Sequence, residues 1–370
     1  MISDLELKNF KCFEKIRIDL KSVNLFTGVN GVGKSTVIQA LLLLRQSFFT
    51  DSESRRLYLN GKYAEMGNSQ DAVYDKAQED FVEINLTTSD GKKCMHVFSY
   101  EQDTDYLTAV KNTLDSMKDL QTGGEALYGE NFVYLSAYRI KPQERYGVIS
   151  EKDLRTRNFG NNGEFALQYL GVYGDEDVKN PCVVVEDAKG KSLINQVRIW
   201  LDKVSPGVSP QIKVMMDSRF SELSFDFIEG KEKTNSYKSL NVGFGITYIL
   251  PVVVALLSSR PGDLIIIENP EAHIHPAGQR MLGELIARAG AGGAQVIVET
   301  HSDHIINGVR ISVKEKYISE DNVQVAFFFK DELQGYRHTY QTLQIFEDGR
   351  LSTWPKGFLD EWEKALIDLL

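Results

Sequence analysis

The chain has 370 residues, of which 42% are hydrophobic and 25% are charged, and its formal net charge is −10. This size and composition fit one large or two modest globular domains, with a core that needs no disulfide or metal to hold it. The acidic balance argues against binding nucleic acid through the charge of the whole surface, and three cysteines without paired spacing argue for a reducing compartment and against a zinc site.

The first predicted elements are strands. Ile2–Leu7, Ile16–Ile18 and Val23–Phe26 carry the alternating or apolar patterns that strands show. The opening residues also carry acids where a secretory signal carries bases, so we expect a cytoplasmic protein.

The segment Gly28–Ser35 reads GVNGVGKS and fits the phosphate-loop (P-loop) pattern GxxxxGKS between a strand and a helix. Its glycines let backbone N–H groups turn towards the phosphates of a nucleotide, and the helix N-terminus adds a positive field. Lys34 supplies a charge for the β- and γ-phosphates, and Ser35 supplies a hydroxyl for Mg²⁺. A glycine-rich turn without a ligand is the weaker interpretation.

The middle of the chain is harder to interpret. Alternating residues from Val82 to Leu86, a turn at Asp90-Gly91 and the segment Met95–Tyr100 predict a β-hairpin. Apolar residues then recur at helical spacing, which favours a helix packed on the core over one that binds a partner, at Leu107, Val110, Leu114, Met117 and Leu120. Residues 130–230 read as a mixture of short strands and loops.

From residue 240 the chain alternates between helices and strands. We predict helices at Phe244–Leu257, with a kink at Pro251, at Ala277–Ala289, ended by Gly290–Gly293, and at Leu359–Leu369. We predict strands at Leu264–Glu268, Gln295–Thr300, Val323–Phe329 and Thr342–Phe346. Such alternation around a P-loop favours a mainly parallel sheet. The longest apolar stretch, Tyr248–Leu257, is shorter than the roughly 20 residues that cross a bilayer, so we expect no membrane partner.

Two strand ends carry candidate chemistry. Leu264–Glu268 is an apolar strand that ends in an acid, the Walker B pattern, and Glu268 is our candidate carboxylate for Mg²⁺, although a buried strand can also end in an acid by chance. His301 follows the next strand, where an imidazole can donate to the γ-phosphate and sense it.

The order of these motifs, together with Asn9–Phe13 near the start and the glycine-rich Asn241–Gly245, resembles ABC-class ATPases of the RecF, SMC and OLD (overcoming lysogenization defect) group. The closing segment Trp354–Phe358, with Asp360–Trp362, resembles the stand-alone branch of OLD-like ATPases.

The resemblance implies an α/β fold: an ABC-type P-loop nucleotide-binding fold with a mainly parallel sheet, an antiparallel β-subdomain and a helical insertion. We expect a single ATPase domain in two lobes. Its segments would be a P-loop lobe with a β-hairpin (1–100), an accessory insertion (101–235), a lobe with the signature, Walker B and switch histidine (236–310), and C-terminal strands and a helix (311–370).

The resemblance also implies the site residues. Glu268 takes the Walker B position, where most relatives have Asp, and would hold Mg²⁺ with Ser35, while His301 takes the switch-histidine position. The signature segment would reach the γ-phosphate held by a second subunit, although it lacks a clear LSGGQ, and Gln70 is only a guess for the Q-loop glutamine. The residues expected to bind ATP are Gly28, Asn30, Gly31, Val32, Gly33, Lys34, Ser35, Thr36, Asn241, Gly243 and Gly245.

One position departs from the family. Asn269 stands where a catalytic glutamate usually polarises the attacking water, and an amide can orient water but accepts its proton poorly. Either hydrolysis is slow, which we favour, or Glu271 acts instead. Asn269 could also serve only as a cap.

A competing interpretation concerns the imidazoles and carboxylates near these strands, which could bind a transition metal as in a nuclease. We rank it below the family interpretation, because the motif order already accounts for His301. The residues concerned are Glu271, His273, His275, His301 and His304.

We therefore expect a slow ATP-driven switch that forms a homodimer or higher homo-oligomer around ATP and Mg²⁺, in phage defence or DNA maintenance. Its effector, with a nuclease as the candidate, is expected to be a separate chain, because only roughly 60 residues follow His304, fewer than a nuclease domain needs. A module that holds ATP without turnover is the alternative. Nucleic acid is a further candidate partner, through two basic clusters that could equally be ordinary surface: Arg45, Arg55, Arg56 and Lys62; and Arg145, Lys152, Arg155 and Arg157.

Overall fold

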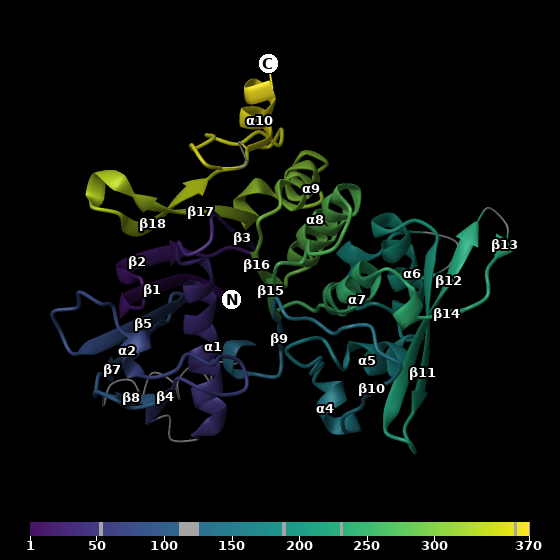
Figure 1. Cartoon of the computed structure of the whole chain (residues 1–370), viewed down its shortest axis with the longest axis horizontal. Helices are drawn as coiled ribbons and strands as arrows, with labels where there is room; N and C mark the ends of the chain where they lie inside the picture. The colour runs from purple at the N-terminus through teal and green to yellow at the C-terminus, as the bar shows by residue number, and fades with distance from the viewer. Residues whose placement is uncertain (52–54, 111–125, 187–189, 230–231, 359–360, 370) are drawn as a thin grey trace.

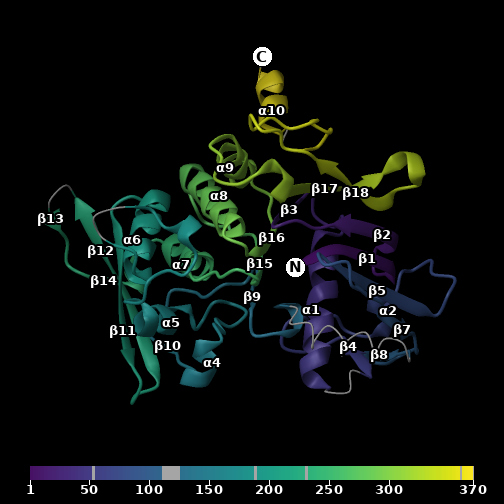
Figure 2. The same ribbon diagram turned by 180° about the vertical axis from the view of Figure 1, so that it is seen from behind.

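The computed structural model describes residues 1–51, 55–110, 126–186, 190–229, 232–358 and 361–369. Figures 1 and 2 show two lobes on either side of a central sheet, with the C-terminal segment above the sheet. The N-terminal lobe holds α1 and an antiparallel sheet, and the other lobe is built from helices and a smaller antiparallel sheet.

The central sheet has the strand order β18-β17-β3-β16-β15-β9. All its neighbouring strands are parallel except β17 and β18. Its inner strands are continuous apolar runs because both faces are covered, as is usual for parallel sheets. The expected α/β fold with a mainly parallel sheet is therefore confirmed. The bounds are β3 Val23–Thr27, β9 Phe132–Leu135, β15 Leu264–Glu268, β16 Gln295–Glu299, β17 Val323–Asp331 and β18 Arg337–Leu343.

The N-terminal lobe contains a separate antiparallel sheet of order β2-β1-β5-β7-β8-β4, with β6 also paired to β5. The predicted hairpin is confirmed, since β5 pairs with both β6 and β7. The predicted helix that begins at Leu107 is wrong at its start, because Leu107 is buried in strand β8; Leu114, Met117 and Leu120 lie outside the described residues. The bounds are β1 Ile2–Phe10, β2 Phe13–Asp19, β4 Arg56–Tyr58, β5 Phe81–Thr88, β6 Lys93–Cys94, β7 Val97–Ser99, β8 Tyr106–Ala109, α1 Lys34–Thr50 and α2 Ser69–Ala72.

Residues 130–230 contain more helix than the sequence indicated. Helix α6 buries one apolar face that includes Trp200, and it packs against α7, α8 and β11. The sheet beside it has the order β10-β12-β11, with β13 and β14 on β12. The bounds are α4 Glu151–Arg155, α5 Ala166–Tyr173, α6 Leu193–Val204, β10 Tyr146–Gly147, β11 Val208–Met215, β12 Phe220–Glu229, β13 Glu232–Lys233 and β14 Tyr237–Lys238.

Three helices follow in the second half. Helix α7, Phe244–Leu257, has the predicted bounds with Pro251 inside it, and α8, Pro276–Ala291, ends at the predicted glycines. Helix α9, Asp303–Lys314, lies against α8. At their crossing Gly283 faces Gly308, and a Cβ on either one would overlap backbone atoms of the other helix. The absence of side chains is therefore what lets the two backbones approach so closely.

The C-terminal segment closes the chain. Strand β18 ends at Leu343, earlier than predicted, and helix α10 spans Glu361–Leu369. Phe358 is buried, with its ring against Phe327 at 5.4 Å and Trp354 at 5.5 Å between centroids. This aromatic contact attaches the segment to β17.

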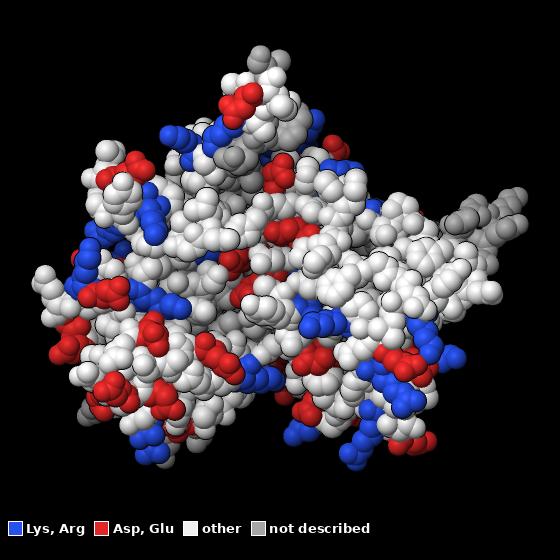
Figure 3. Space-filling model, viewed as in Figure 1, with Lys and Arg blue, Asp and Glu red and all other residues white. Residues whose placement is uncertain are grey.

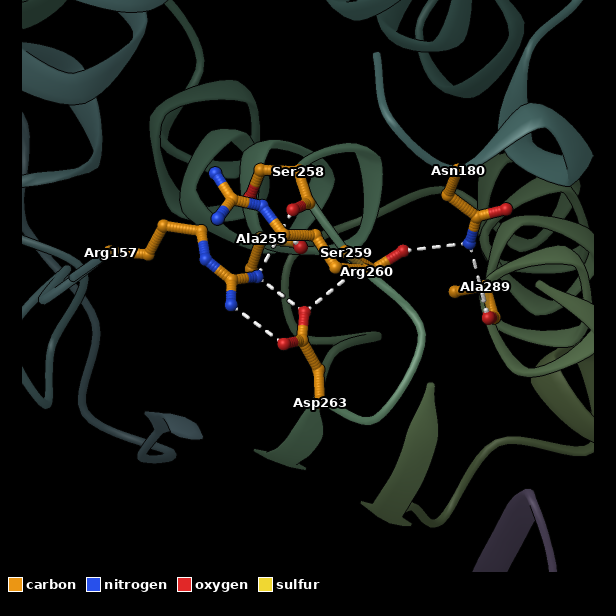
Figure 4. A network of polar contacts seen from close by, with 8 residues as sticks. All are labelled: Arg157, Asn180, Ala255, Ser258, Ser259, Arg260, Asp263 and Ala289. Atoms are coloured by element: carbon orange, nitrogen blue, oxygen red, sulfur yellow. Dashed lines mark hydrogen bonds and ion pairs between the residues drawn. The ribbon is translucent and has the colours of Figure 1, made fainter. Parts of the chain in front are cut away.

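The amino end of β15 holds a buried ion pair, shown in Figure 4. Both oxygens of Asp263 bond to the Arg157 guanidinium, one of them at 2.6 Å, and the backbone N–H of Arg260 donates to the same carboxylate at 2.6 Å. The Arg157 guanidinium also donates to the Ser258 carbonyl at 3.1 Å. Arg157 is only 2% exposed, so one member of the second basic cluster is a structural residue.

The first basic cluster also loses a member to the interior. Arg45 is 7% exposed and donates to the carbonyls of Leu127 and Gly129 at 2.6 and 3.1 Å. Its guanidinium lies 3.9 Å from the centroid of the Phe132 ring. Each cluster therefore has one buried member that serves the interior of the chain.

Candidate functional site

The loop between β3 and α1 borders a cavity of about 260 Å³ at the carboxyl end of the central sheet. Gly28, Gly31 and Gly33 all have positive φ, which leaves the loop free to turn its backbone N–H groups inward. Figure 3 shows acidic side chains in the hollow between the lobes, over the region where Figure 1 places β15 and β16. The cavity is lined by Lys11, Cys12, Asn30, Gly31, Gly33, Lys34, Ser35, Thr36, Gln39 and Glu299.

Lys34 lies inside this loop and is 3% exposed. Its ammonium donates to the carbonyls of Gly28 and Val29 at 2.9 and 2.8 Å, and it lies 4.0 Å from Glu299 Oε1. Burial lowers the pKa of Lys34, and the charge of Glu299 opposes that shift. The loop thus holds a cation at the place where a nucleotide phosphate would lie.

Glu299, at the end of β16, is the residue that the sequence analysis missed. Its Oε1 accepts a hydrogen bond from Ser35 Oγ at 2.9 Å, whereas its Oε2 is buried and has no hydrogen-bond partner within the described residues. Burial raises the pKa of Glu299 to about 7, and the charge of Glu268 adds to the rise. The signal was present: QVIVE, like LIIIE, is an apolar strand that ends in an acid.

Glu268, at the end of β15, is bonded towards β9. Its Oε1 accepts from the Tyr134 hydroxyl and its Oε2 from the Ala137 backbone N–H, both at 3.1 Å. Burial raises the pKa of Glu268, and these hydrogen bonds oppose the rise. Glu268 and Glu299 are paired in register across β15 and β16, so the two acids lie side by side.

Asn269 begins the loop after β15 with a left-handed backbone, φ +43°. Its N–H donates to the Glu299 carbonyl at 2.8 Å, and its own carbonyl accepts from the Arg139 guanidinium at 3.1 Å. Asparagine tolerates this conformation better than most residues, which gives Asn269 a structural reason to be present. Its Oδ1 is buried without a hydrogen-bond partner among the residues described.

Arg139 fixes the loop that follows β15, and nothing in the sequence pointed to it. It is 5% exposed, donates also to the Glu268 carbonyl, and lies 4.7 Å from the centroid of the Tyr248 ring. Burial lowers the pKa of Arg139, while contact with Tyr248 opposes the shift.

Glu271 holds the segment that carries the predicted switch histidine. Its carboxylate accepts from the His301 backbone N–H at 2.7 Å and from the Thr300 hydroxyl at 2.8 Å. Burial raises the pKa of Glu271. The His301 ring lies beside the P-loop: burial lowers its pKa, the charge of Lys34 lowers it further, and a hydrogen bond with the Gly28 backbone opposes both.

The signature segment lies elsewhere. Asn241 ends a short 3-10 turn and Gly243 caps the N-terminus of α7, which packs against α5, α6 and α8 in the lobe opposite α1. Both residues are exposed, and neither lines the cavity beside the P-loop. A Cβ on Gly245 would overlap the His273 carbonyl, so that glycine is explained by packing within the chain.

The histidines near these strands are spread among separate contacts. His273 packs its ring on Phe244 and Tyr248, and His275 Nδ1 accepts from the Ala277 N–H at the start of α8. Over the part of the chain that the structure describes, no group of three His, Cys, Asp or Glu side chains could hold a metal ion. Gln70, the guess for the Q-loop, instead bonds to Asp103 at the surface of the N-terminal lobe.

The cavity suits a nucleotide with Mg²⁺ on chemical grounds. The backbone N–H groups of a loop with three positive-φ glycines and the Lys34 ammonium suit phosphate oxygens. The Ser35 hydroxyl and the unpaired Glu299 oxygen are hard oxygen donors of the kind that Mg²⁺ prefers alongside phosphates. Of the helices described, none combines the length and apolar character that a bilayer crossing requires.

Comparisons with known families cover most of the chain. A model described as "AAA ATPase domain" matches residues 1–167, and one described as "AAA domain, putative AbiEii toxin, Type IV TA system" matches 136–307. Residues 318–369 match "Protein of unknown function (DUF3696)".

Three curated proteins are similar in sequence. The chain is 25% identical to an OLD nuclease of Thermus scotoductus over 329 residues, which cover 82% of this chain and 59% of the relative. It is 24% identical to the endonuclease GajA of Bacillus cereus over 55% of this chain and 33% of the relative. An ATP/GTP phosphatase of Helicobacter pylori is 25% identical over 46% of this chain and 40% of the relative. The chain thus spans less than two thirds of each relative's length.

Solved structures share the fold. An SMC head bound to the C-terminal winged-helix domain of ScpA superposes with a TM-score of 0.56 at 14% identity, over 93% of this chain and 98% of that one. The SMC head of Pyrococcus furiosus, bound to the C-terminal domain of ScpA, gives 0.56 at 13% identity over 100% and 99%.

Proposed function

We propose, from the premise that the chain is an ABC-like P-loop ATPase of the OLD/SMC type, that it is an ATP-driven switch. Two copies would close around ATP, and their nucleotide state would control a separate effector protein. The observation that carries the proposal is the separation of the two half-sites. Lys34 and Ser35 line a cavity in one part of the molecule, whereas Gly243 opens α7 on an exposed surface of the other lobe.

Each residue then has a defined task. The P-loop N–H groups and Lys34 would bind the β- and γ-phosphates, and Ser35 with a strand-end carboxylate would hold the metal. Mg²⁺, when bound, would neutralise charge that develops on the phosphate oxygens. His301, beside Gly28, donates to the γ-phosphate, and Glu271 holds the His301 backbone in that position.

Hydrolysis in this scheme is slow. Asn269 orients water but is a poor acceptor of its proton. Glu271 is a weak candidate for the base, because both its oxygens already accept hydrogen bonds. A slow step keeps the ATP-bound dimer in existence long enough for an effector to respond to it.

The same asparagine favours a second candidate function, a module that binds ATP and never hydrolyses it. Steady-state phosphate release separates the two. Turnover that exceeds the background and is lost in Lys34→Ala supports the switch, and phosphate release equal to that of Lys34→Ala supports the static module.

The effector we propose is a nuclease, in phage defence or DNA maintenance. Support comes from the relatives, two of which are described as an OLD nuclease and an endonuclease. Further support comes from the SMC heads of the same fold, which are described in complex with ScpA.

Sedimentation tests the switch. We expect the chain to dimerise with a non-hydrolysable ATP analogue and Mg²⁺, to remain monomeric without nucleotide, and to lose the response in Lys34→Ala. A monomer at saturating analogue, or the same dimer in Lys34→Ala, would contradict the proposal.

A further inference from the structure

The geometry points to Glu299, on the strand next to the P-loop, as the carboxylate that completes the Mg²⁺ site with Ser35. In this assignment Glu268, on the neighbouring strand, bonds towards β9 and does not hold the ion. The inference rests on the proposed function only in requiring that the cavity bind ATP.

The contacts of the two acids differ. Glu299 lines the cavity beside the P-loop and accepts a hydrogen bond from Ser35 Oγ at 2.9 Å. A P-loop serine that binds Mg²⁺ lies next to the acid that shares the ion. Glu268 has both oxygens engaged by Tyr134 and Ala137 on the side of β9.

The strand order explains why. Strand β16 lies directly between β3 and β15, and Glu299 pairs in register with Phe26 of β3 on one side and with Glu268 on the other. Because neighbouring strands are about 4.8 Å apart, the end of β15 is roughly 10 Å from β3 and the end of β16 is half as far. Glu299 therefore reaches Ser35 with less extension than Glu268 needs.

The Oε2 atom of Glu299, which accepts no hydrogen bond within the described residues, favours a bound cation. Glu299 is 6% exposed, and its Oε2 has no hydrogen-bond partner in the described part of the chain. A buried carboxylate oxygen without a partner costs free energy that a bound cation removes. The Lys34 ammonium lies 4.0 Å from the other oxygen, Oε1, and already donates to two carbonyls.

The test measures ATP affinity by calorimetry with Mg²⁺ and with EDTA, for the parent chain, Glu299→Gln, Glu299→Asp and Glu268→Gln. The gain in affinity due to Mg²⁺ should fall at least about tenfold in Glu299→Gln, fall partly in Glu299→Asp, and persist in Glu268→Gln. Affinity in EDTA should not fall in Glu299→Gln, because the substitution removes a negative charge near the phosphates.

A second readout follows the metal itself. Mn²⁺ in place of Mg²⁺ should bind the ATP complex of the parent more tightly than that of Glu299→Gln, as measured by electron paramagnetic resonance of the free ion. A Mg²⁺ gain lost in Glu268→Gln and kept in Glu299→Gln would overturn the assignment. So would a Glu299→Gln variant that keeps the gain and loses only turnover, since Glu299 would then act on water. Failure of the parent to bind ATP would instead refute the proposed function.

Discussion

Strand β15 and its neighbours carry buried carboxylates at both ends of the central sheet, and the protein satisfies them differently. At the amino end, Asp263 is 1% exposed, bonds to Arg157 through both oxygens and accepts a further bond from the Arg260 backbone. At the carboxyl end, Glu299 keeps one oxygen without a hydrogen-bond partner within the described ranges, and burial raises the pKa of both Glu299 and Glu268.

The difference separates stability from function. A carboxylate whose bonds are all made within the chain has little capacity left for a ligand. Neighbouring buried acids with an oxygen that accepts no hydrogen bond lower the free energy of unfolding. Ligands and metals bind at such sites. Substitutions at the amino end should therefore reduce folding stability, and substitutions at the carboxyl end should change nucleotide chemistry.

The largest effect is expected from Asp263→Ala, which leaves Arg157 buried without its partner. Breaking a buried pair in this way costs about 3–5 kcal/mol of the free energy of unfolding, to be measured by urea denaturation. Arg155→Ala is the matched control, because Arg155 pairs with Glu151 at the surface, and it should cost less than about 1 kcal/mol. Equal urea midpoints for Asp263→Ala and the parent would contradict the proposed difference between the two ends of the central sheet.

Lys34→Ala should mainly weaken nucleotide binding, whereas Asp263→Ala mainly lowers folding stability. Loss of a charged donor at the phosphates should weaken ATP binding about 100-fold in calorimetry, or about 2.7 kcal/mol. The nucleotide-free variant should lose less stability than Asp263→Ala, since Lys34 makes two hydrogen bonds to loop carbonyls and a longer, 4.0 Å ion pair with Glu299. Unchanged ATP affinity would refute the assignment of the whole site.

The rate of hydrolysis is the next comparison. Asn269→Glu should raise steady-state turnover at least about tenfold, because a general base contributes roughly 100- to 10,000-fold. The left-handed backbone at this position should cost the variant about 1–2 kcal/mol of folding stability. Glu271→Gln should change turnover little, since an amide oxygen still accepts from the His301 N–H. If Glu271→Gln abolishes hydrolysis and Asn269→Glu has no effect, Glu271 is the base.

The smallest effect is expected at the signature segment. Gly243→Asp should weaken ATP-dependent association about tenfold in sedimentation, because a carboxylate close to the partner's γ-phosphate repels it. Gly243→Asn is the matched control: a Cβ there meets nothing within 4 Å, and both residues suit a helix N-cap. Equal association of the two variants would argue against a contact between subunits at this point.

Sequence patterns located the elements whose signal is local. Strands β15 and β16 read as apolar runs because both faces of a parallel sheet are buried, and α7 begins at a glycine and ends with its apolar run. Helix α6 was missed although its apolar face is regular, because short strands and loops on either side obscured its period. The pairing of Arg157 with Asp263 spans 106 positions and has no local signal at all.

Within the site, the P-loop was visible from its motif, whereas the partners of each acid were not. The end of a strand can be read from sequence, but the order of strands in the sheet decides which acid lies beside Ser35. Arg139 was equally hidden, since its contacts come from β15 and α7, far along the chain.

The glycine contact between α8 and α9 joins these two helices closely. Helix α8 starts just after the loop that carries Glu271, and α9 starts just after His301. Gly283 lies directly against Gly308, so the two helix backbones are in close contact. Arg310 of α9 donates to the Gly349 carbonyl at 2.8 Å, which couples the pair to the C-terminal segment. The two helices thus connect the segments that carry Glu271 and His301 to the carboxyl-terminal segment through direct packing and one hydrogen bond.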